Sequence, residues 1–286
     1  MSSTTKSKFP LPTISNKPMN RKAIITGGST GIGRATAVAL ARSGHDVAIT
    51  YAHGEDDAKR TAEMVQAEGR VCVVKQLDLS NPDTANPVVD EMVDELGGLD
   101  VFVNNAGMMV NQTMPDLDVE TAQRIFNVNT IGATLAIQRA VHHMLPGGLE
   151  GDAKSTPGRI IVVTSVHEAI ASPVDTLYTM TKHALGGLVK CLALDLTPLN
   201  ITVNSVAPGE IATPMNDMDP DDAESSPREA IPVRRVGHPD EVAAVINFLA
   251  GEQAGFVTGA RWPIDGGFEA AAPLAASAFR EDYLAQ

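Results

Sequence analysis

Cysteine and long apolar runs are both scarce in this sequence. Its 286 residues include only two cysteines, Cys72 and Cys191, and neither has a partner at the spacing of a metal-binding or redox motif. No run of about eighteen apolar residues occurs, and a helix that spans a bilayer needs about that many. We therefore expect no disulfide framework, no bound metal and no membrane partner, and we interpret both cysteines as reduced core residues.

Basic residues are also few. The sequence has 22 lysines and arginines against 35 aspartates and glutamates, which gives a formal net charge of -13. A protein that binds nucleic acid needs a basic face to neutralise phosphates, and no cluster of lysine and arginine occurs that could form one. We therefore expect no nucleic-acid partner and interpret the negative charge as an aid to solubility through self-repulsion.

The chain divides into a central domain and two terminal segments. Residues 1–20 are polar and rich in proline, without an apolar stretch that could act as a signal peptide, so we expect a flexible extension on a cytoplasmic protein. Residues 21–267 have enough apolar material for one large domain. Within this domain, residues 214–235 are rich in proline and acidic side chains, which predicts a mobile substrate loop. Residues 268–286 form an alanine-rich tail.

Short runs rich in valine and isoleucine alternate along the domain with longer stretches of helical length. The runs mostly lack polar alternation, as in strands that are covered on both faces. Because parallel strands need crossover connections and helices supply them, this rhythm predicts an α/β fold with a doubly wound parallel sheet and helices on both faces. We expect about seven strands, over 22–26, 46–51, 70–77, 99–105, 159–165, 201–207 and 261–265, and helices over 32–43, 56–68, 83–96, 119–145, 175–196 and 239–250.

A glycine-rich turn, residues 26–33, follows the first predicted strand and opens the first predicted helix. Its glycines, spaced G-x-x-x-G-x-G, allow a tight turn and a close approach of the backbone to a pyrophosphate. Free N–H groups at the helix N-terminus can then bind that anion. The spacing differs from the usual G-x-G-x-x-G pattern, and a turn of this kind alone could serve a purely structural role.

Tyr178 and Lys182 are four positions apart on a predicted helix, so their side chains share one face. A free tyrosine holds its proton to about pH 10, too high for a useful base near neutrality. A nearby positive charge, such as the Lys182 ammonium or a cationic group of a bound ligand, favours the phenolate and is expected to lower the pKa. Ser165 ends the fifth predicted strand, and its hydroxyl can hold a substrate oxygen while charge develops there. By themselves, Tyr178 and Lys182 could also be an ordinary surface pair.

Several motifs in register resemble the short-chain dehydrogenase/reductase family, and the match runs from about residue 21 to residue 267. The resemblance implies a Rossmann-type fold and hydride transfer between a nicotinamide dinucleotide and a carbonyl or secondary alcohol. Besides the glycine turn, Ser165 and the pair Tyr178-x-x-x-Lys182, the motifs are Asp78-Leu79, which the family uses to hold the adenine ring, Asn104-Asn105-Ala106-Gly107, and Pro208-Gly209 followed by Thr213, a loop that contacts the nicotinamide amide.

The resemblance also implies a mechanism. Ser165 and Tyr178 would hold the carbonyl oxygen, Tyr178 would act as general acid/base, and Lys182 would reach the nicotinamide ribose. Asn129, in an N-x-x-G pattern, would help to hold a water in a proton relay towards the lysine, with Asn127 as the fallback. The residues implied for the cofactor are Gly27, Ser29, Thr30, Gly31, Ile32, Gly33, Tyr51, His53, Asp78, Leu79, Asn105, Ala106, Gly107, Tyr178, Lys182, Pro208, Gly209, Ile211 and Thr213.

The sequence gives a partial indication of which nicotinamide is used. NAD enzymes commonly place an acid at the end of the second strand, and Tyr51 stands there instead. The basic residue that often meets the 2′-phosphate of NADP is also missing, because Thr30 occupies its position. A polar pocket made by Ser29, Thr30, Tyr51 and His53 could accept a phosphate, which favours NADP(H) over NAD(H).

The sequence contains few signals for the substrate, and it is also compatible with functions other than a dehydrogenase or reductase. A relative of the same fold could perform epimerisation or dehydration, and a sensor or scaffold could bind the dinucleotide without turnover, although the complete Ser–Tyr–Lys set argues for an enzyme. The family forms dimers and tetramers through the helices predicted at 119–145 and 175–196, so a homo-oligomer is expected.

Candidate residues around a small carbonyl or alcohol substrate are Met108, Met109, His167, Glu168, Met215 and Trp262, although methionine and tryptophan are more often packing residues.

Overall fold

The computed structural model describes residues 20–271, so the predicted extension 1–20 lies outside the described residues except for residue 20, and the predicted tail except for 268–271. Within this part the strands form one parallel sheet in the order β3-β2-β1-β4-β5-β6-β7, which confirms the predicted doubly wound fold. The strands are β1 (Arg21–Ile25), β2 (His45–Tyr51), β3 (Cys72–Gln76), β4 (Val101–Asn104), β5 (Gly158–Val163), β6 (Ile201–Pro208) and β7 (Arg261–Ile264).

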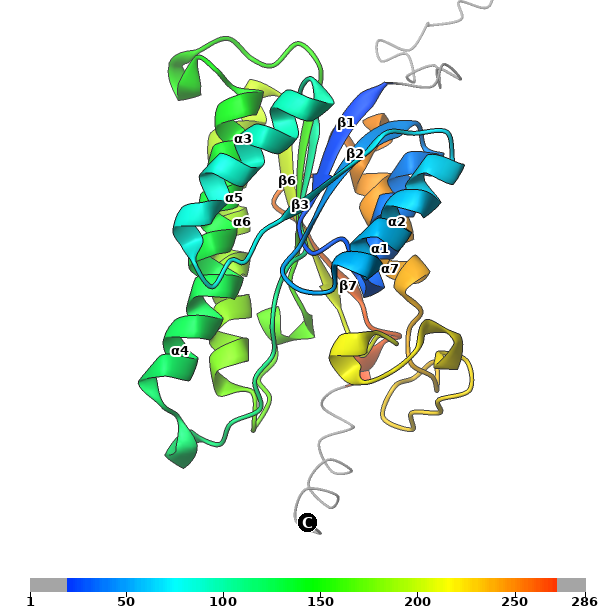
Figure 1. The fold of residues 1–286 in the computed structure, drawn as a ribbon. Helices are drawn as coiled ribbons and strands as arrows, with labels where there is room; N and C mark the ends of the chain where they lie inside the picture. Colours follow the sequence, from blue (N-terminus) through cyan, green and yellow to red (C-terminus); the bar gives the residue numbers. More distant parts are fainter. Residues whose placement is uncertain (1–19, 272–286) are drawn as a thin grey trace, which may run out of the picture.

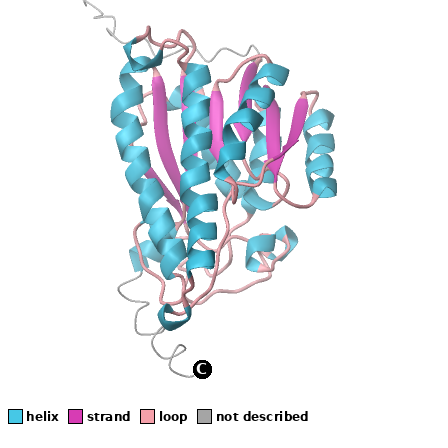
Figure 2. Cartoon of the chain, turned by 60° about the vertical axis from the view of Figure 1, so that its left-hand side comes forward, coloured by secondary structure: helices cyan, strands magenta, loops and turns pink. Residues whose placement is uncertain are grey.

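Helices cover both faces of the sheet, which Figure 2 shows as strands enclosed between two helical layers. In Figure 1, α3, α4, α5 and α6 lie on one side of the sheet and α1, α2 and α7 on the other. No helix within residues 20–271 is long and apolar enough to cross a membrane. The helices are α1 (Gly31–Arg42), α2 (Glu55–Ala67), α3 (Ala85–Leu96), α4 (Val119–Phe126), α5 (Ala133–Met144), α6 (Thr176–Leu196) and α7 (Pro239–Ala250).

The two helical layers give the molecule two hydrophobic cores, and alternate residues of each central strand belong to different ones. In β5, Ile160 and Val162 pack in the core under α3, α5 and α6, whereas Ile161 and Val163 pack in the core under α1 and α7. Successive side chains of a strand point to opposite faces, so a strand that is covered on both sides needs an apolar residue at every position. This explains the unbroken apolar runs in the sequence.

The order of the strands creates a crevice at their carboxyl ends. From β1 the chain builds outward through β2 and β3, then crosses over to β4 on the other side of β1. The loops after β1 and β4 therefore leave in opposite directions, and a gap opens between them. This is the place in a parallel α/β sheet where ligands bind.

The prediction of one helix over 119–145 is wrong in one respect. A π-helical turn, Asn127–Gly132, separates α4 from α5. Gly132 has no room for a side chain, since a Cβ there would lie 2.9 Å from the Asn127 carbonyl oxygen and 3.0 Å from Leu79. The π-turn widens the helix by one residue and changes which side chains face inward. Asn129, in this turn, is 1% exposed and faces the loop after β4.

The segment predicted as a mobile loop, 214–235, covers the same end of the sheet. It contains two short 3₁₀ turns, Pro214–Asn216 and Pro220–Asp222, and it buries Ile231. Arg228 in this segment forms an ion pair with Glu210, with Nη2 and Oε1 2.7 Å apart. The segment is therefore packed onto the domain, and its mobility stays a prediction.

Candidate active site

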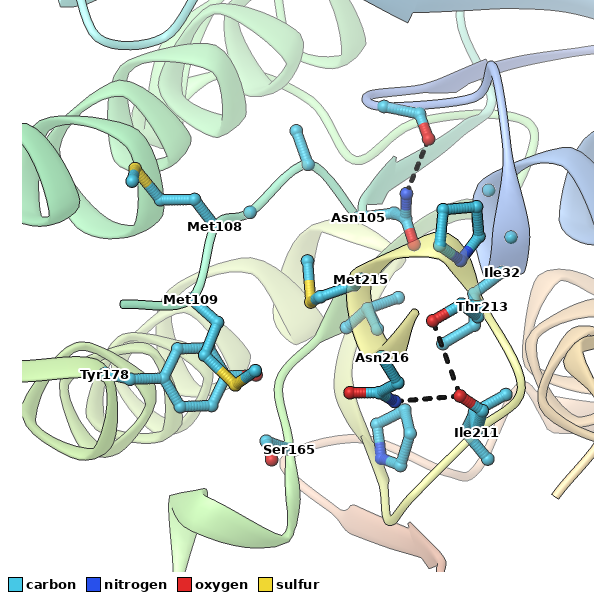
Figure 3. A pocket seen from close by; sticks show the side chains of 18 of the residues that line it. Ile32, Asn105, Met108, Met109, Ser165, Tyr178, Ile211, Thr213, Met215 and Asn216 are labelled. Atoms are coloured by element: carbon cyan, nitrogen blue, oxygen red, sulfur yellow. Dashed lines mark hydrogen bonds between the residues drawn. The ribbon is translucent and has the colours of Figure 1, made fainter. Parts of the chain in front are cut away.

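A pocket of about 820 Å³ lies at the carboxyl ends of the central strands. Its lining comes from loops that are far apart in the sequence, in particular 27–33 after β1, 105–109 after β4, 163–167 after β5 and 208–216 after β6. Figure 3 shows Ser165, Tyr178, Met108 and Met109 on one side of this pocket, opposite the side chains contributed by the loop after β6.

Hydrogen bonds hold the glycine turn against the loop after β4. The Thr26 hydroxyl accepts hydrogen bonds from the backbone N–H groups of Asn105 and Ala106, each at 3.0 Å. In return, the Asn105 amide donates to the carbonyl oxygens of Thr26 and Gly27 at 2.9 and 2.8 Å. Gly33 has no room for a side chain, because a Cβ there would lie 2.1 Å from the Gly27 oxygen. These contacts hold the turn as a narrow, backbone-lined cradle.

The cradle fits a dinucleotide. Thr30, the residue before α1, makes no side-chain hydrogen bond to the helix, and the first turn of α1 contains no acidic residue, so its N–H groups can receive a pyrophosphate. At the far end, Asp78 accepts from the backbone N–H of Ser80 at 2.9 Å, which holds the pKa of this carboxyl below its usual range. Asp78 and Leu79 both line the pocket, where the family holds its adenine ring.

Of the residues predicted for the cofactor, only Tyr51 lies outside the pocket lining. Tyr51 packs against the core on the α1 and α7 side, whereas its neighbours Thr50 and Ala52 face the pocket. The reason is the alternation of side chains along β2, since the Thr50 hydroxyl accepts from Gly27 N at 3.0 Å and so fixes which residues point inward. The other predicted residues line the pocket: Gly27, Ser29, Thr30, Gly31, Ile32, Gly33, His53, Asp78, Leu79, Asn105, Ala106, Gly107, Tyr178, Lys182, Pro208, Gly209, Ile211 and Thr213.

The structure brings the three predicted catalytic side chains together. Tyr178 and Lys182 lie one turn apart on α6, and the Lys182 ammonium is 5.4 Å from the centre of the Tyr178 ring. Ser165, the second residue after β5, forms a hydrogen bond with Tyr178. All three line the pocket although each is less than a tenth exposed.

Burial controls the protonation of this group. It raises the pKa of Tyr178 to about 12, against the smaller opposing effect of the hydrogen bond with Ser165. It also lowers the pKa of Lys182 to about 8, and the Glu168 carboxylate partly opposes that change. The lowered pKa expected for Tyr178 is therefore wrong for the protein alone. Lys182 is itself desolvated and donates to the Val163 carbonyl oxygen at 3.2 Å, so it does not offset the burial of the phenol.

Asn129 lies behind the wall of the pocket, and its side chain connects the loop after β4 to α6 through hydrogen bonds. Its Oδ1 accepts from Met108 N and its Nδ2 donates to Met108 O, both at 2.8 Å, and Nδ2 also donates to the Thr181 hydroxyl at 3.1 Å. A Cβ added at Gly107 would lie 3.4 Å from Asn129 Oδ1 and 3.6 Å from Lys182 Nζ, so both groups approach this glycine. The fallback residue Asn127 instead donates to the Ser80 oxygen. A relay role for Asn129 stays a prediction.

Two of the substrate candidates do not line the pocket. Trp262 packs edge-on against Phe248, with ring centres 6.0 Å apart, as part of the core under α7. The Glu168 side chain, 6% exposed, points beneath the site, where it accepts from the Thr164 hydroxyl at 2.6 Å and the Ser205 hydroxyl at 3.3 Å and approaches Arg261 at 3.6 Å. The remaining candidates, Met108, Met109, His167 and Met215, line the pocket.

Other lining residues were missed by the sequence reasoning. Arg124 lies in α4 and Ser172 in the loop before α6, and neither belongs to a recognisable motif. Arg228 and Ile231 come from the segment 214–235, whose composition predicted a loop near the substrate but no particular residue. The pairing of Arg228 with Glu210, eighteen positions earlier, had no signal in the spacing of the sequence.

Comparison with known proteins gives matches over most of the chain. Residues 27–269 match the family model described as enoyl-(acyl carrier protein) reductase. The chain is 42% identical to the uncharacterized oxidoreductase YohF of Escherichia coli (strain K12), over 89% of this chain and 98% of that protein. It is 36% identical to the L-rhamnose 1-dehydrogenase (NAD(P)(+)) of Sphingomonas sp. (strain SKA58), over 86% of this chain and 95% of that protein. The crystal structure of acetoin dehydrogenase YohF from Salmonella typhimurium is 41% identical with a TM-score of 0.80, covering 88% of this chain and 96% of that one.

The contact between α6 and the buried carboxylate gives a prediction about stability. A Cβ at Gly186 would lie 2.6 Å from Glu168 Cγ, so Gly186→Ala forces Glu168 away from its hydrogen-bond partners. We expect a loss of about 1–3 kcal/mol in the free energy of unfolding, measured with urea, as for other overpacked sites.

In the Glu168→Ala background the obstructing atom is gone, and Gly186→Ala should then stabilise the protein by up to about 1 kcal/mol through helix propensity. Equal effects of Gly186→Ala in the two backgrounds would show that the contact does not matter.

Proposed function

The chain belongs to the short-chain dehydrogenase/reductase family and is an oxidoreductase of alcohol and carbonyl groups, and we propose that Ser165, Tyr178 and Lys182 are its catalytic residues. The observation that supports this assignment is their convergence in one pocket, whose opposite wall is the glycine cradle. A sensor or scaffold that binds the dinucleotide without turnover would not need a buried phenol, ammonium and hydroxyl at this place.

The protonation of the site suits the reduction of a carbonyl. Because burial keeps Tyr178 neutral, its hydroxyl can donate a proton to the substrate oxygen. The Ser165 oxygen accepts from the backbone N–H of His167 at 3.2 Å, and its hydroxyl proton, which Tyr178 accepts in the protein alone, can turn to the same substrate oxygen. When bound, the dinucleotide supplies the hydride in reduction and takes it in oxidation. Lys182 contributes a positive charge beside Tyr178.

For the cofactor we infer a preference for NADP(H). The residues of the pocket near the end of β2 are Ala52 and His53, and together with Ser29 and Thr30 they bring polar groups but no carboxylate to the place where NAD enzymes bind the ribose 2′-OH. Arg34 is committed elsewhere, because its guanidinium donates to the Ser29 oxygen at 2.6 Å and to the Asp57 carboxylate at 3.0 Å. Ser29, Thr30 and His53 would hold the 2′-phosphate.

For the assembly we propose a homo-oligomer, a tetramer as in many relatives of this fold, that acts in the cytoplasm. The outer face of α6 exposes Met180 and Leu194, the latter 79% exposed, and a shallow apolar groove lies at the end of this helix. Exposed apolar surface of this kind is common at subunit interfaces. Both cysteines are free thiols, which fits a reducing compartment, but Cys191 is exposed, so the expectation that it is a core residue is wrong.

The function is tested by following NADPH oxidation with a panel of ketones, diketones and 3-oxoacyl thioesters. Tyr178→Phe removes the proton donor and keeps the ring, so we expect turnover to fall by at least ~100-fold while NADPH still binds. A variant that kept its turnover would remove Tyr178 from the mechanism. NADPH binding without turnover of any compound by the native protein would argue against the enzyme.

The cofactor preference is tested with Ala52→Asp. A carboxylate at this place accepts a hydrogen bond from the ribose 2′-OH and repels a 2′-phosphate, so we expect kcat/KM with NADPH to fall by about tenfold or more relative to NADH. Ala52→Asn, which has nearly the same shape without the charge, serves as the control. A native protein that prefers NADH, or an equal effect of both substitutions, would contradict the assignment of this end of the pocket.

A further inference from the structure

Arg228 and Glu210 form an ion pair between two segments that line the pocket. Arg228 Nε donates to both carboxylate oxygens of Glu210 at 2.9 Å, and Nη2 donates to Oε1 at 2.7 Å. The remaining nitrogen, Nη1, donates to the Pro227 carbonyl oxygen at 3.1 Å. Each guanidinium nitrogen therefore already has an acceptor. Both residues line the pocket and both side chains are 37% exposed, so the pair is accessible to a ligand.

The pair lies near the reacting end of the pocket. Glu210 follows Gly209 directly, in the loop predicted to contact the nicotinamide amide. The next residues of this loop, among them Met215, lie across the pocket from Ser165 and Tyr178 in Figure 3. A substrate held by Ser165 and Tyr178 therefore extends into the space that this loop borders.

The other basic side chains of the pocket are less suited to bind a charged substrate group. Within residues 20–271 the lysine and arginine residues that line the pocket are Arg124, Lys182 and Arg228. Lys182 is 4% exposed and donates to the Val163 carbonyl oxygen. Arg124 lies near Asp78, the pKa of which its charge helps to lower, and so belongs to the adenine end. Arg228 is thus the cation that a substrate carboxylate would need.

Backbone hydrogen bonds fix both members of the pair independently of their side chains. The Arg228 N–H donates to the Arg234 carbonyl oxygen at 3.1 Å, and the Glu210 carbonyl oxygen accepts from the Gly237 N–H at 3.0 Å. Removal of the Glu210 charge is therefore expected to leave the guanidinium near its present place. The consequence of the pair for a ligand is the charge and the donors that the pocket offers.

We propose that Glu210 excludes substrates that carry a carboxylate, because it occupies the donors of Arg228 and adds a negative charge to the pocket, so that the enzyme acts on uncharged carbonyl compounds. An anion that leaves water without gaining a partner loses its hydration without compensation, and a like charge repels it. Uncharged compounds meet neither cost and can pack against the apolar part of the wall: Met108, Met109, Met215 and Ile231. This inference rests on the proposed function and names the substrate class of the same site.

Three keto acids and their methyl esters test the proposal: 2-oxopropanoate, 3-oxobutanoate and 4-oxopentanoate. The two members of each pair contain the same ketone and differ in one charge, and the three lengths place that charge at different distances from the reacting carbon. The readout is the ratio of kcat/KM for the acid to kcat/KM for its ester, with NADPH as cofactor. Comparison of this ratio between variants cancels the intrinsic reactivity of each compound and any general loss of activity.

Glu210→Gln keeps the shape of the side chain and removes its charge. We expect the ratio to rise by at least about tenfold for one or more of the lengths, the effect of one charge-assisted hydrogen bond from the released Arg228. The double variant Glu210→Gln with Arg228→Gln should lose this gain.

The matched control is Glu229→Gln. It removes the same charge from the residue next to Arg228, which is exposed and does not line the pocket. Since exposed charges are screened by salt, its ratios should stay within about twofold of the native values.

An unchanged ratio in Glu210→Gln, a gain that persists without Arg228, or an equal gain in Glu229→Gln would overturn the proposal. A native protein that prefers one of the acids to its ester would overturn it as well.

Failure of the enzyme function has a different signature, because the native protein then reduces neither the esters nor any compound of the wider carbonyl panel. Calorimetric titration of the NADP⁺ complex with 4-oxopentanoate and its ester, where no reduction can occur, decides the proposal in that case. A ratio of binding constants that rises in Glu210→Gln and falls back in the double variant supports the exclusion, and an unchanged ratio overturns it.

Discussion

Two ionisable side chains, Tyr178 and Lys182, are buried next to each other on one face of α6, and the rest of the site depends on what burial does to them. The loss of water favours the neutral form of both side chains. It raises the pKa of Tyr178 to about 12 and lowers the pKa of Lys182 to about 8. Glu168 lies beneath this pair and favours the charged lysine, and Thr164, Ser205 and Arg261 hold that carboxylate. The site therefore keeps a proton on Tyr178 until an additional positive charge arrives.

The parallel sheet explains how such a site can be assembled from distant segments. Loops after four neighbouring strands meet at one edge, and short hydrogen bonds between Asn105 and the turn at Thr26 and Gly27 join two of them. On the other side, the π-turn directs Asn129 onto the loop at Met108, next to Lys182. Binding groups and the proton donor are thus carried by one rigid framework, which favours a fixed alignment of cofactor and substrate.

The sequence allowed the fold and most of the cofactor residues to be predicted, because each depends on a short contiguous pattern such as an apolar run or a glycine turn. The errors arose where a single step of register decides the outcome. Tyr51 and Ala52 are neighbours, yet only Ala52 lines the pocket, and on the turn after Ser165 His167 lines it while the next residue, Glu168, points beneath it. No local sequence pattern indicates which of two neighbouring residues at a strand end faces the pocket. The π-turn at Asn129 has no local sequence pattern either. Whether the pKa of Tyr178 is raised or lowered depends on the burial of its side chain, and burial is defined only by the fold.

The most direct test is a titration of Tyr178 itself, by tyrosinate absorbance with and without NADP⁺. The chain has three tyrosines, so subtraction of the Tyr178→Phe variant isolates this one. The account predicts no Tyr178 signal up to about pH 10 in the protein alone, where a free tyrosine would be half ionised. With NADP⁺ bound, the signal should move to lower pH, because the nicotinamide cation favours the phenolate. Ionisation of Tyr178 near neutrality in the protein alone, or a pKa that NADP⁺ does not change, would contradict the central role of burial in this site.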